Sequence, residues 1–203
     1  RHIVRGDHFA RGPAFTHFDP NILHGQEVFG ATLGIIGMGG VGQQVARRAA
    51  GFDMKVLYHN RSEIPEIAGK LGATYVSLPE LLAQSDFVTL NVPMTLETRN
   101  MIGRDELAMM KPTAILVNAA RGGVLDHDAL VDALSEGTIW AAALDVTEPE
   151  PLPRDHPLLA MGNIVIAPHL GSATRKTRIG MVQRTIENLI AGLTGGDMPS
   201  RVA

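Results

Sequence analysis

The chain of 203 residues has no cysteine, few aromatic residues (4%) and no long hydrophobic run. Without cysteine it has neither a disulfide framework nor thiol chemistry, which favours a cytoplasmic location. No apolar segment approaches the roughly 20 residues that a membrane-spanning helix needs, and we find no signal peptide. A formal net charge of −3 argues against nucleic acid or an anionic membrane as a partner. We also predict no metal site.

The composition is that of a globular protein. An apolar fraction of 45% and a charged fraction of 19% are ordinary, and the length suits one generous domain. The chain begins at Arg1 rather than at a methionine, so we expect it to be the later part of a longer polypeptide.

Short hydrophobic runs alternate with helical patterns along nearly the whole chain. This alternation predicts an α/β fold, a doubly wound parallel sheet of the Rossmann type with about seven strands and a ligand crevice at their carboxyl ends. The expected strands are Leu33–Gly37, Met54–His59, Thr74–Val76, Asp86–Val92, Ala114–Asn118, Ile139–Val146 and Asn163–Ala167. The expected helices are Val41–Gly51, Ile64–Leu71, Leu78–Ala83, Glu106–Met109, Asp128–Glu136 and Ala173–Leu193. Gly51 and Gly137 stand where helix C-caps are expected.

A glycine motif follows the first expected strand. Gly37, Gly39 and Gly42 form G-x-G-x-x-G between a strand and a helix, the context in which this motif holds a dinucleotide pyrophosphate. Gly37 would allow the tight turn, Gly39 would let the backbone approach the phosphates, and Gly42 would bring the helix close to the strand. The helix that starts near Gly40 would direct N–H groups at the anion. The strand and helix favour cofactor binding over the alternative, a merely structural glycine turn.

The end of the second strand indicates which dinucleotide is preferred. It reads Asn60-Arg61-Ser62, with no acid before Glu63, whereas NAD-binding versions carry an Asp or Glu here for the ribose 2′-hydroxyl. Arg61 can pair with a 2′-phosphate, and Asn60 and Ser62 can donate hydrogen bonds. NADP(H) is therefore preferred. NAD(H) stays open, because Arg61 can also be a solvated loop arginine.

Three segments follow strands and should reach the crevice, namely residues 117–123, 144–152 and 167–174. Between them they carry an arginine, glutamates and a histidine. Beside a nicotinamide ring, an arginine can bind a substrate carboxylate and polarise a carbonyl, and a histidine can protonate the developing alkoxide. A glutamate can hold the imidazolium and raise its pKa.

At these motifs the chain resembles the D-isomer-specific 2-hydroxyacid dehydrogenases, over roughly residues 30–200. Within the family it is most similar to the glyoxylate/hydroxypyruvate reductases. The matching pieces are the glycine motif, Asn91-Val92-Pro93 with Glu97-Thr98-Arg99, Asn118–Gly122, Leu144-Asp145-Val146 through Glu150-Pro151-Leu152, and Pro168-His169-Leu170-Gly171. Pro151-Leu152-Pro153, His156-Pro157-Leu158, His169–Thr174 and Asn60-Arg61-Ser62 point to the reductases.

The resemblance implies hydride transfer between NADPH and a small 2-oxoacid or 2-hydroxyacid. Arg121 would bind the substrate, and His169 would donate the proton in reduction. Glu150, five residues after Asp145, would be the partner of His169, which leaves Glu148 as a surface residue. The implied cofactor contacts are Gly37, Met38, Gly39, Gly40, Val41, Gly42, Asn60, Arg61, Ser62, Val92, Pro93, Thr98, Ala119, Ala120, Arg121, Asp145, His169 and Gly171.

The resemblance also implies how the chain is organised. Residues 1–32 would be a connecting and dimerisation lead-in, 33–175 the dinucleotide-binding domain, and 176–203 a C-terminal helix that returns to a substrate domain absent from this chain. A homodimer is expected. Without the closure that a substrate domain provides, we expect this chain alone to bind cofactor but to catalyse little.

Two other functions stay open at this point. The first is an NAD(H)-sensing interaction protein built on the same fold, and Asn60-Arg61-Ser62 counts against it. The second is an NAD-linked dehydrogenase of the phosphoglycerate type. The choice of 2-oxoacid would depend mainly on the absent domain.

Overall fold

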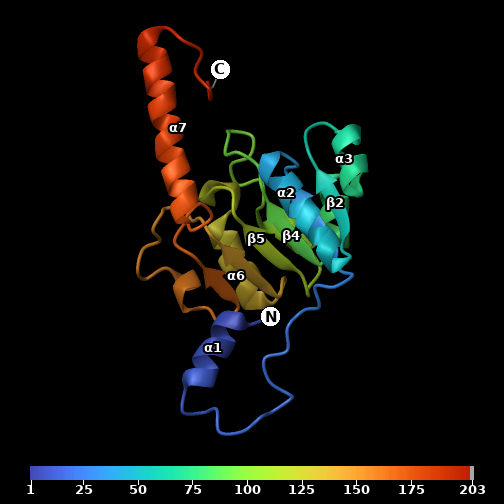
Figure 1. Ribbon diagram of the computed structural model, residues 1–203. Coiled ribbons are helices and arrows are strands. Elements are labelled where there is room, and N and C mark those ends of the chain that lie inside the picture. The colour runs from blue at the N-terminus through green and yellow to red at the C-terminus, as the bar shows by residue number, and fades with distance from the viewer. Residues whose placement is uncertain (202–203) are drawn as a thin grey trace. The chain divides into compact units, whose positions relative to one another are not determined.

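A computed structural model describes residues 1–201 (Figure 1). The chain divides into two compact units, Arg1–Ala167 and a second unit that starts at Pro168. The sheet lies entirely in the first unit. Among the described residues, no helix has both the length and the apolar character needed to cross a membrane.

A single parallel sheet of seven strands forms the centre of the first unit. The strands lie side by side in the order β3-β2-β1-β4-β5-β6-β7, and every pairing is parallel. The first six places are the doubly wound order of dinucleotide-binding folds, and β7 extends that sheet by one strand. The bounds are β1 Thr32–Ile36, β2 Lys55–His59, β3 Ala73–Tyr75, β4 Phe87–Leu90, β5 Ile115–Asn118, β6 Ala141–Leu144 and β7 Ile164–Ile166.

Helices cover both faces of the sheet, and the alternation of β1 shows which helices share a face. Leu33 and Ile35 pack in a cluster with buried alanines of α2 and α3, whereas Ile36 belongs to a cluster with α4, α5 and α6. Because successive strand side chains point to opposite faces, the two helix groups lie on opposite sides. The bounds are α1 Ile3–Arg11, α2 Gly40–Ala49, α3 Pro65–Leu71, α4 Leu78–Gln84, α5 Arg104–Met109, α6 His127–Glu136 and, in the second unit, α7 Arg175–Thr194.

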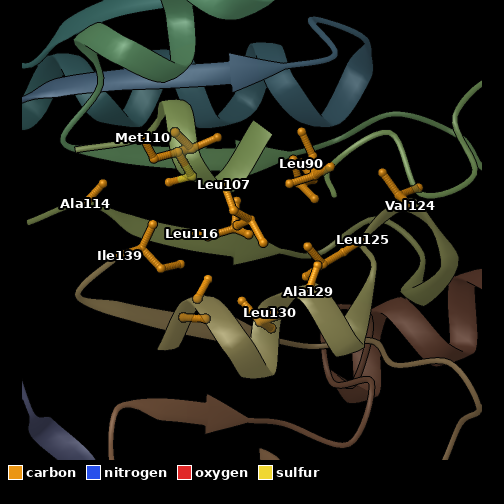
Figure 2. Close-up of a cluster of buried hydrophobic side chains, with 14 of the residues drawn as sticks. Leu90, Leu107, Met110, Ala114, Leu116, Val124, Leu125, Ala129, Leu130 and Ile139 are labelled. Carbon is orange, nitrogen blue, oxygen red and sulfur yellow. The ribbon is translucent and has the colours of Figure 1, made fainter. Parts of the chain in front are cut away.

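The larger core cluster lies between the sheet and the helices α4, α5 and α6. Figure 2 shows Leu116 of β5 surrounded by Leu107 of α5, Leu130 of α6 and Leu90 of β4, all at most 1% exposed. Each such leucine contributes about 1.5–3 kcal/mol through the apolar surface that it removes from water. This core supports the carboxyl ends of β4 and β5, from which the loops of the candidate site leave.

The expected elements are confirmed, each within two residues of its predicted ends. Gly137 is the C-cap of α6, with φ 72°. The prediction for Gly51 is wrong, because α2 ends at Ala49 and passes into a 3₁₀ turn, Ala50–Phe52, in which Gly51 lies. The predicted boundaries after residues 32 and 175 stay predictions.

The sixth strand is shorter than expected. The apolar run Ile139–Val146 contains only four strand residues, Ala141–Leu144. Ile139 and Val146 are buried in loops at its two ends, at 0% and 2% exposure. Apolar residues therefore mark burial here, and burial continues where the ladder of hydrogen bonds has stopped.

Candidate cofactor and active site

The glycine motif forms the turn between β1 and α2. Gly37 has φ 97°, and a Cβ there would stand 2.8 Å from the Asn91 carbonyl at the end of β4. A Cβ on Gly42 would overlap the Gly37 carbonyl oxygen, so only glycine lets α2 sit this close to β1. By contrast, a Cβ on Gly39 would meet no atom within 4 Å. The protein itself does not require glycine at position 39, which leaves that backbone open to a ligand.

The end of β2 is tied to this turn. The Met38 backbone N–H donates to Asn60 Oδ1 at 2.8 Å, and the Tyr75 hydroxyl donates to the Asn60 carbonyl at 3.2 Å. The Met38 side chain is 1% exposed, so only its backbone can face a ligand. Arg61 and Ser62, the next residues, are both exposed. Asn60 therefore holds the loop, and Arg61 carries the positive charge at its rim.

Two cavities lie along the carboxyl ends of the strands in the first unit. The first, of about 420 Å³, is lined by the ends of β1 and β2, including Asn60–Ser62, and by the turn after β4. The second, of about 520 Å³, is lined by Val41, Met94 and Ala119–Arg121. Residues 91–93 line both cavities. Two cavities that share a wall, each within the usual range for ligand pockets, suit a ligand with two halves.

The turn after β4 is held by its threonines. The Thr98 hydroxyl donates to the Pro93 carbonyl at 2.7 Å and accepts from the Thr95 backbone N–H at 2.7 Å. The Thr95 hydroxyl donates to Glu97 Oε2 at 2.6 Å. This bond, a second from the Glu97 backbone and the charge of Arg61 hold the pKa of the Glu97 carboxyl below its ordinary value. The contact predicted between Thr98 and phosphates stays a prediction, and the structure gives its hydroxyl a role in the turn.

A buried asparagine shapes the loop that carries Arg121. Asn118, at the end of β5, is 0% exposed; its Oδ1 accepts from the Ala120 N–H at 3.0 Å and its Nδ2 donates to the Arg121 carbonyl at 2.9 Å. The Arg121 guanidinium is exposed and donates to the Ala120 carbonyl at 2.7 Å. Asn118 was absent from the predicted site residues, although it stands in the segment that carries the family resemblance.

The loop after β6 lies against this one. A Cβ on Gly122 would overlap the Thr147 carbonyl, and a Cβ on Gly123 would overlap the Glu148 carboxylate. Glu148 forms an ion pair with Arg99 at 2.9 Å, so the expected surface residue also joins two loops. Glu150 lies two residues further along the same exposed stretch. Asp145 directly follows β6, and its backbone N–H donates to the Asn118 carbonyl at 2.9 Å.

Two histidines, His127 and His156, line a cavity together with Glu148. His127 is 7% exposed, and its ring meets that of His156 edge-on with centroids 6.4 Å apart. Burial lowers the pKa of His127 below its ordinary value. Its Nδ1 bonds to the Leu125 carbonyl at 3.1 Å, which requires Nδ1 to carry the proton. Nothing in the sequence pattern distinguished His127 from other helix residues.

The last predicted site residues belong to the second unit. His169 has φ 54°, a left-handed backbone conformation that is uncommon outside glycine and is enriched at functional positions. Gly171 follows it in the same unit. Because Arg121 and Glu150 are in the first unit, their approach to His169 stays a prediction. Among residues 1–201, no group of three or more His, Asp or Glu side chains could hold a metal ion.

Comparison with known proteins agrees with this fold. The family model described as "D-isomer specific 2-hydroxyacid dehydrogenase, NAD binding domain" matches residues 1–171. The chain belongs to this family. It is the family's NAD-binding domain, and the doubly wound order of its sheet is that of dinucleotide-binding folds.

Several relatives that share this domain are named glyoxylate reductases. The chain is 48% identical to "Glyoxylate reductase" of Aeropyrum pernix, over all of the chain and 62% of the relative. The solved TT0316 protein of Thermus thermophilus is 46% identical, with a TM-score of 0.93 over all of the chain and 63% of that protein. A glyoxylate reductase from "Paecilomyes thermophila" is 42% identical, with a TM-score of 0.83 over 90% of the chain and 55% of that protein. The chain thus spans less than two thirds of the length of these proteins.

Proposed function

We propose that the protein carrying this chain is an NADPH-dependent reductase of a small 2-oxoacid such as glyoxylate or hydroxypyruvate. One observation carries the proposal: paired cavities along the sheet edge have Arg61 at one end and Arg121 at the other. The relatives named glyoxylate reductases support a reductase over a dinucleotide sensor.

The proposal gives the cofactor one orientation along the carboxyl edge of the sheet. The adenosine half would occupy the cavity beside Asn60–Ser62, where Arg61 would pair with the 2′-phosphate. The pyrophosphate would lie over Gly39, where space is open, at the N-terminus of α2. The nicotinamide half would occupy the cavity beside Ala119–Arg121. NAD(H) is the alternative, in which Arg61 has no 2′-phosphate to bind.

The catalytic residues then act on a substrate placed beside the nicotinamide. Bound NADPH supplies the hydride that adds to the keto carbon. Arg121 holds the substrate carboxylate and polarises the carbonyl, which makes its carbon a better acceptor. His169 gives its proton to the carbonyl oxygen as the carbon is reduced, so the product is the neutral hydroxyl. Glu150 stabilises the imidazolium that precedes this transfer.

Glyoxylate-dependent oxidation of NADPH by the native protein tests these roles. His169→Asn should lower kcat by about 10²–10⁴-fold, the usual contribution of a general acid. Arg121→Gln should lower kcat/KM for glyoxylate, since it removes substrate binding and carbonyl polarisation together.

The two glutamates form a matched pair of variants. Glu150→Gln should lower kcat for glyoxylate reduction, because the imidazolium of His169 loses its carboxylate partner. Glu148→Gln should leave kcat near wild type, since Glu148 pairs with Arg99. The reverse result would transfer the role to Glu148. Activity retained in His169→Asn would contradict the proposed reaction.

The remaining expectations stay predictions of the sequence. They are a homodimer, a cytoplasmic location and a separate substrate domain.

A further inference from the structure

The cavity at the ends of β1, β2 and β4 is also lined by an acidic residue. Glu97, on the turn after β4, lines the same cavity as Asn60, Arg61 and Ser62. Glu97 lies 36 positions after Arg61 in the chain, so only the fold brings the acid to the same cavity as the basic residue. A negative charge in this cavity disfavours the 2′-phosphate that Arg61 is expected to attract.

The turn holds the Glu97 carboxylate in place. The Thr95 hydroxyl donates to Glu97 Oε2 at 2.6 Å, while Thr98 closes the turn through its bond to the Pro93 carbonyl at 2.7 Å. The positive charge of Arg61 is one of the influences that keep the pKa of Glu97 low. The carboxylate is therefore ionised at neutral pH, and it lines the same cavity as Arg61.

A 2′-phosphate and the Glu97 carboxylate would need the same guanidinium. Both are anionic oxygen groups, and arginine recognises both with the same N–H donors. The 2′-hydroxyl of NAD(H) carries no charge and makes no such demand. A carboxylate at this position therefore disfavours binding of NADP(H) and has little effect on binding of NAD(H). Repulsion of one ligand is a recognised source of binding specificity.

We propose that Glu97 is an internal counter-ion of Arg61, which competes with the 2′-phosphate of NADP(H) and so limits the preference for NADP(H) over NAD(H). The proposal rests on the proposed function, since it requires a dinucleotide in this cavity. Both side chains are exposed, so solvent screens the competition and its effect is modest.

The test is a double-mutant cycle on the full chain, read by the fluorescence of NADPH and NADH on binding. The variants are Glu97→Gln, Arg61→Ala and the two combined. Glutamine keeps the size of the side chain and can still accept from the Thr95 hydroxyl, so the turn should be retained. Glu63→Gln is the matched control, because it removes an exposed acid directly after Ser62.

Glu97→Gln should increase the affinity for NADPH about two- to fivefold, as expected for loss of one exposed charge interaction. The affinity for NADH should stay unchanged within experimental error. This increase in NADPH affinity should vanish when Arg61→Ala is also present. It should be smaller in about 0.5 M KCl, because salt screens the charges. Glu63→Gln should change the affinity for NADPH less than Glu97→Gln does.

Three results would overturn the proposal. Unchanged or weaker NADPH binding in Glu97→Gln would show that the acid does not oppose the phosphate. An equal gain with and without Arg61 would show that Glu97 does not act through this guanidinium. Wild-type chain that binds neither dinucleotide would contradict the proposed function itself, together with this inference, and so is distinguishable from the first two results.

Discussion

The two edges of the same sheet use their polar residues differently. At the amino edge, Asp86 accepts from Lys111 at 2.7 Å and from the Thr32 N–H at 2.8 Å, so charged and polar groups bind each other. At the carboxyl edge, Asn60 and Asn118 bind backbone, whereas the arginines beside them line cavities. Around Asp86 the amino edge is therefore held by bonds between charged and polar groups, whereas at the carboxyl edge the asparagines hold loops beside two cavities.

The glycine motif, residues 37–42, has one glycine that packs against backbone and one that faces open space. A substitution in it should have the largest effect on the free energy of unfolding. In Gly42→Ala the new Cβ overlaps backbone, so the free energy of unfolding should fall by about 3 kcal/mol or more. The new Cβ in Gly39→Ala meets open space, so we expect a loss of about 1 kcal/mol or less, which is the cost of replacing glycine by alanine at a helix N-cap. Urea unfolding of the two variants measures both values. Equal losses would contradict the division between a packing glycine and a ligand-facing one.

The two asparagines of the carboxyl edge come next. Asn118→Ala removes two hydrogen bonds in a fully buried position and leaves backbone groups without them, so we expect a loss of about 2–4 kcal/mol. Asn60→Ala removes one such bond in a half-buried position and should lose about 1 kcal/mol. Denaturant midpoints of both variants, with the slopes compared, provide the test. A larger loss of stability in Asn60→Ala than in Asn118→Ala would contradict this expectation.

The contribution of Asp86 to the stability of the amino edge should depend on pH. Burial would raise the pKa of Asp86, but bonds from Lys111 and the Thr32 amide and the charge of Lys111 lower it below its ordinary value. Its stabilising contribution is thus present above pH about 3.9 and is lost as pH falls through the lower pKa of the folded state.

Lys111→Met should remove part of this contribution. We expect a loss of about 0.5–1 kcal/mol at pH 7, discounted because both side chains are 35% exposed. The difference from wild type should shrink as the pH falls through the lowered pKa that Asp86 has in the folded state. Thermal unfolding between pH 2.5 and pH 7 follows both proteins. A constant difference across that range would mean that Asp86 is not the partner that matters.

The smallest effect belongs to the ion pair of the carboxyl edge. Arg99 and Glu148 are 47% and 42% exposed, so Arg99→Ala should lose at most about 0.5 kcal/mol. The loss should disappear in 1 M salt, where the screening length is only about 3 Å. A loss larger than that of Lys111→Met would mean that the loops depend on this bridge more than the strands depend on Asp86.

The sequence predicted the strands and helices because their apolar residues recur with the period of each element. It could not predict where β6 ends, since Val146 is buried by loop packing rather than by strand pairing. Asn118 and Thr98 bond to backbone within their loops, and residue type alone does not reveal such bonds. Glu97 became a candidate only once the fold placed it in the cavity of Arg61, 36 residues away in the chain.

The most direct test of the account is titration of the chain with NADPH and with NADH, before and after Arg61→Ala. Loss of a charge-assisted pair to the 2′-phosphate should weaken NADPH binding by about 1.5–3 kcal/mol, roughly ten- to a hundredfold, and leave NADH nearly unchanged. That result would assign the cavity beside Asn60–Ser62 to the adenosine end of NADP(H). Binding of both dinucleotides with equal affinity, unaffected by Arg61→Ala, would contradict the NADPH assignment and favour the NAD-linked alternatives.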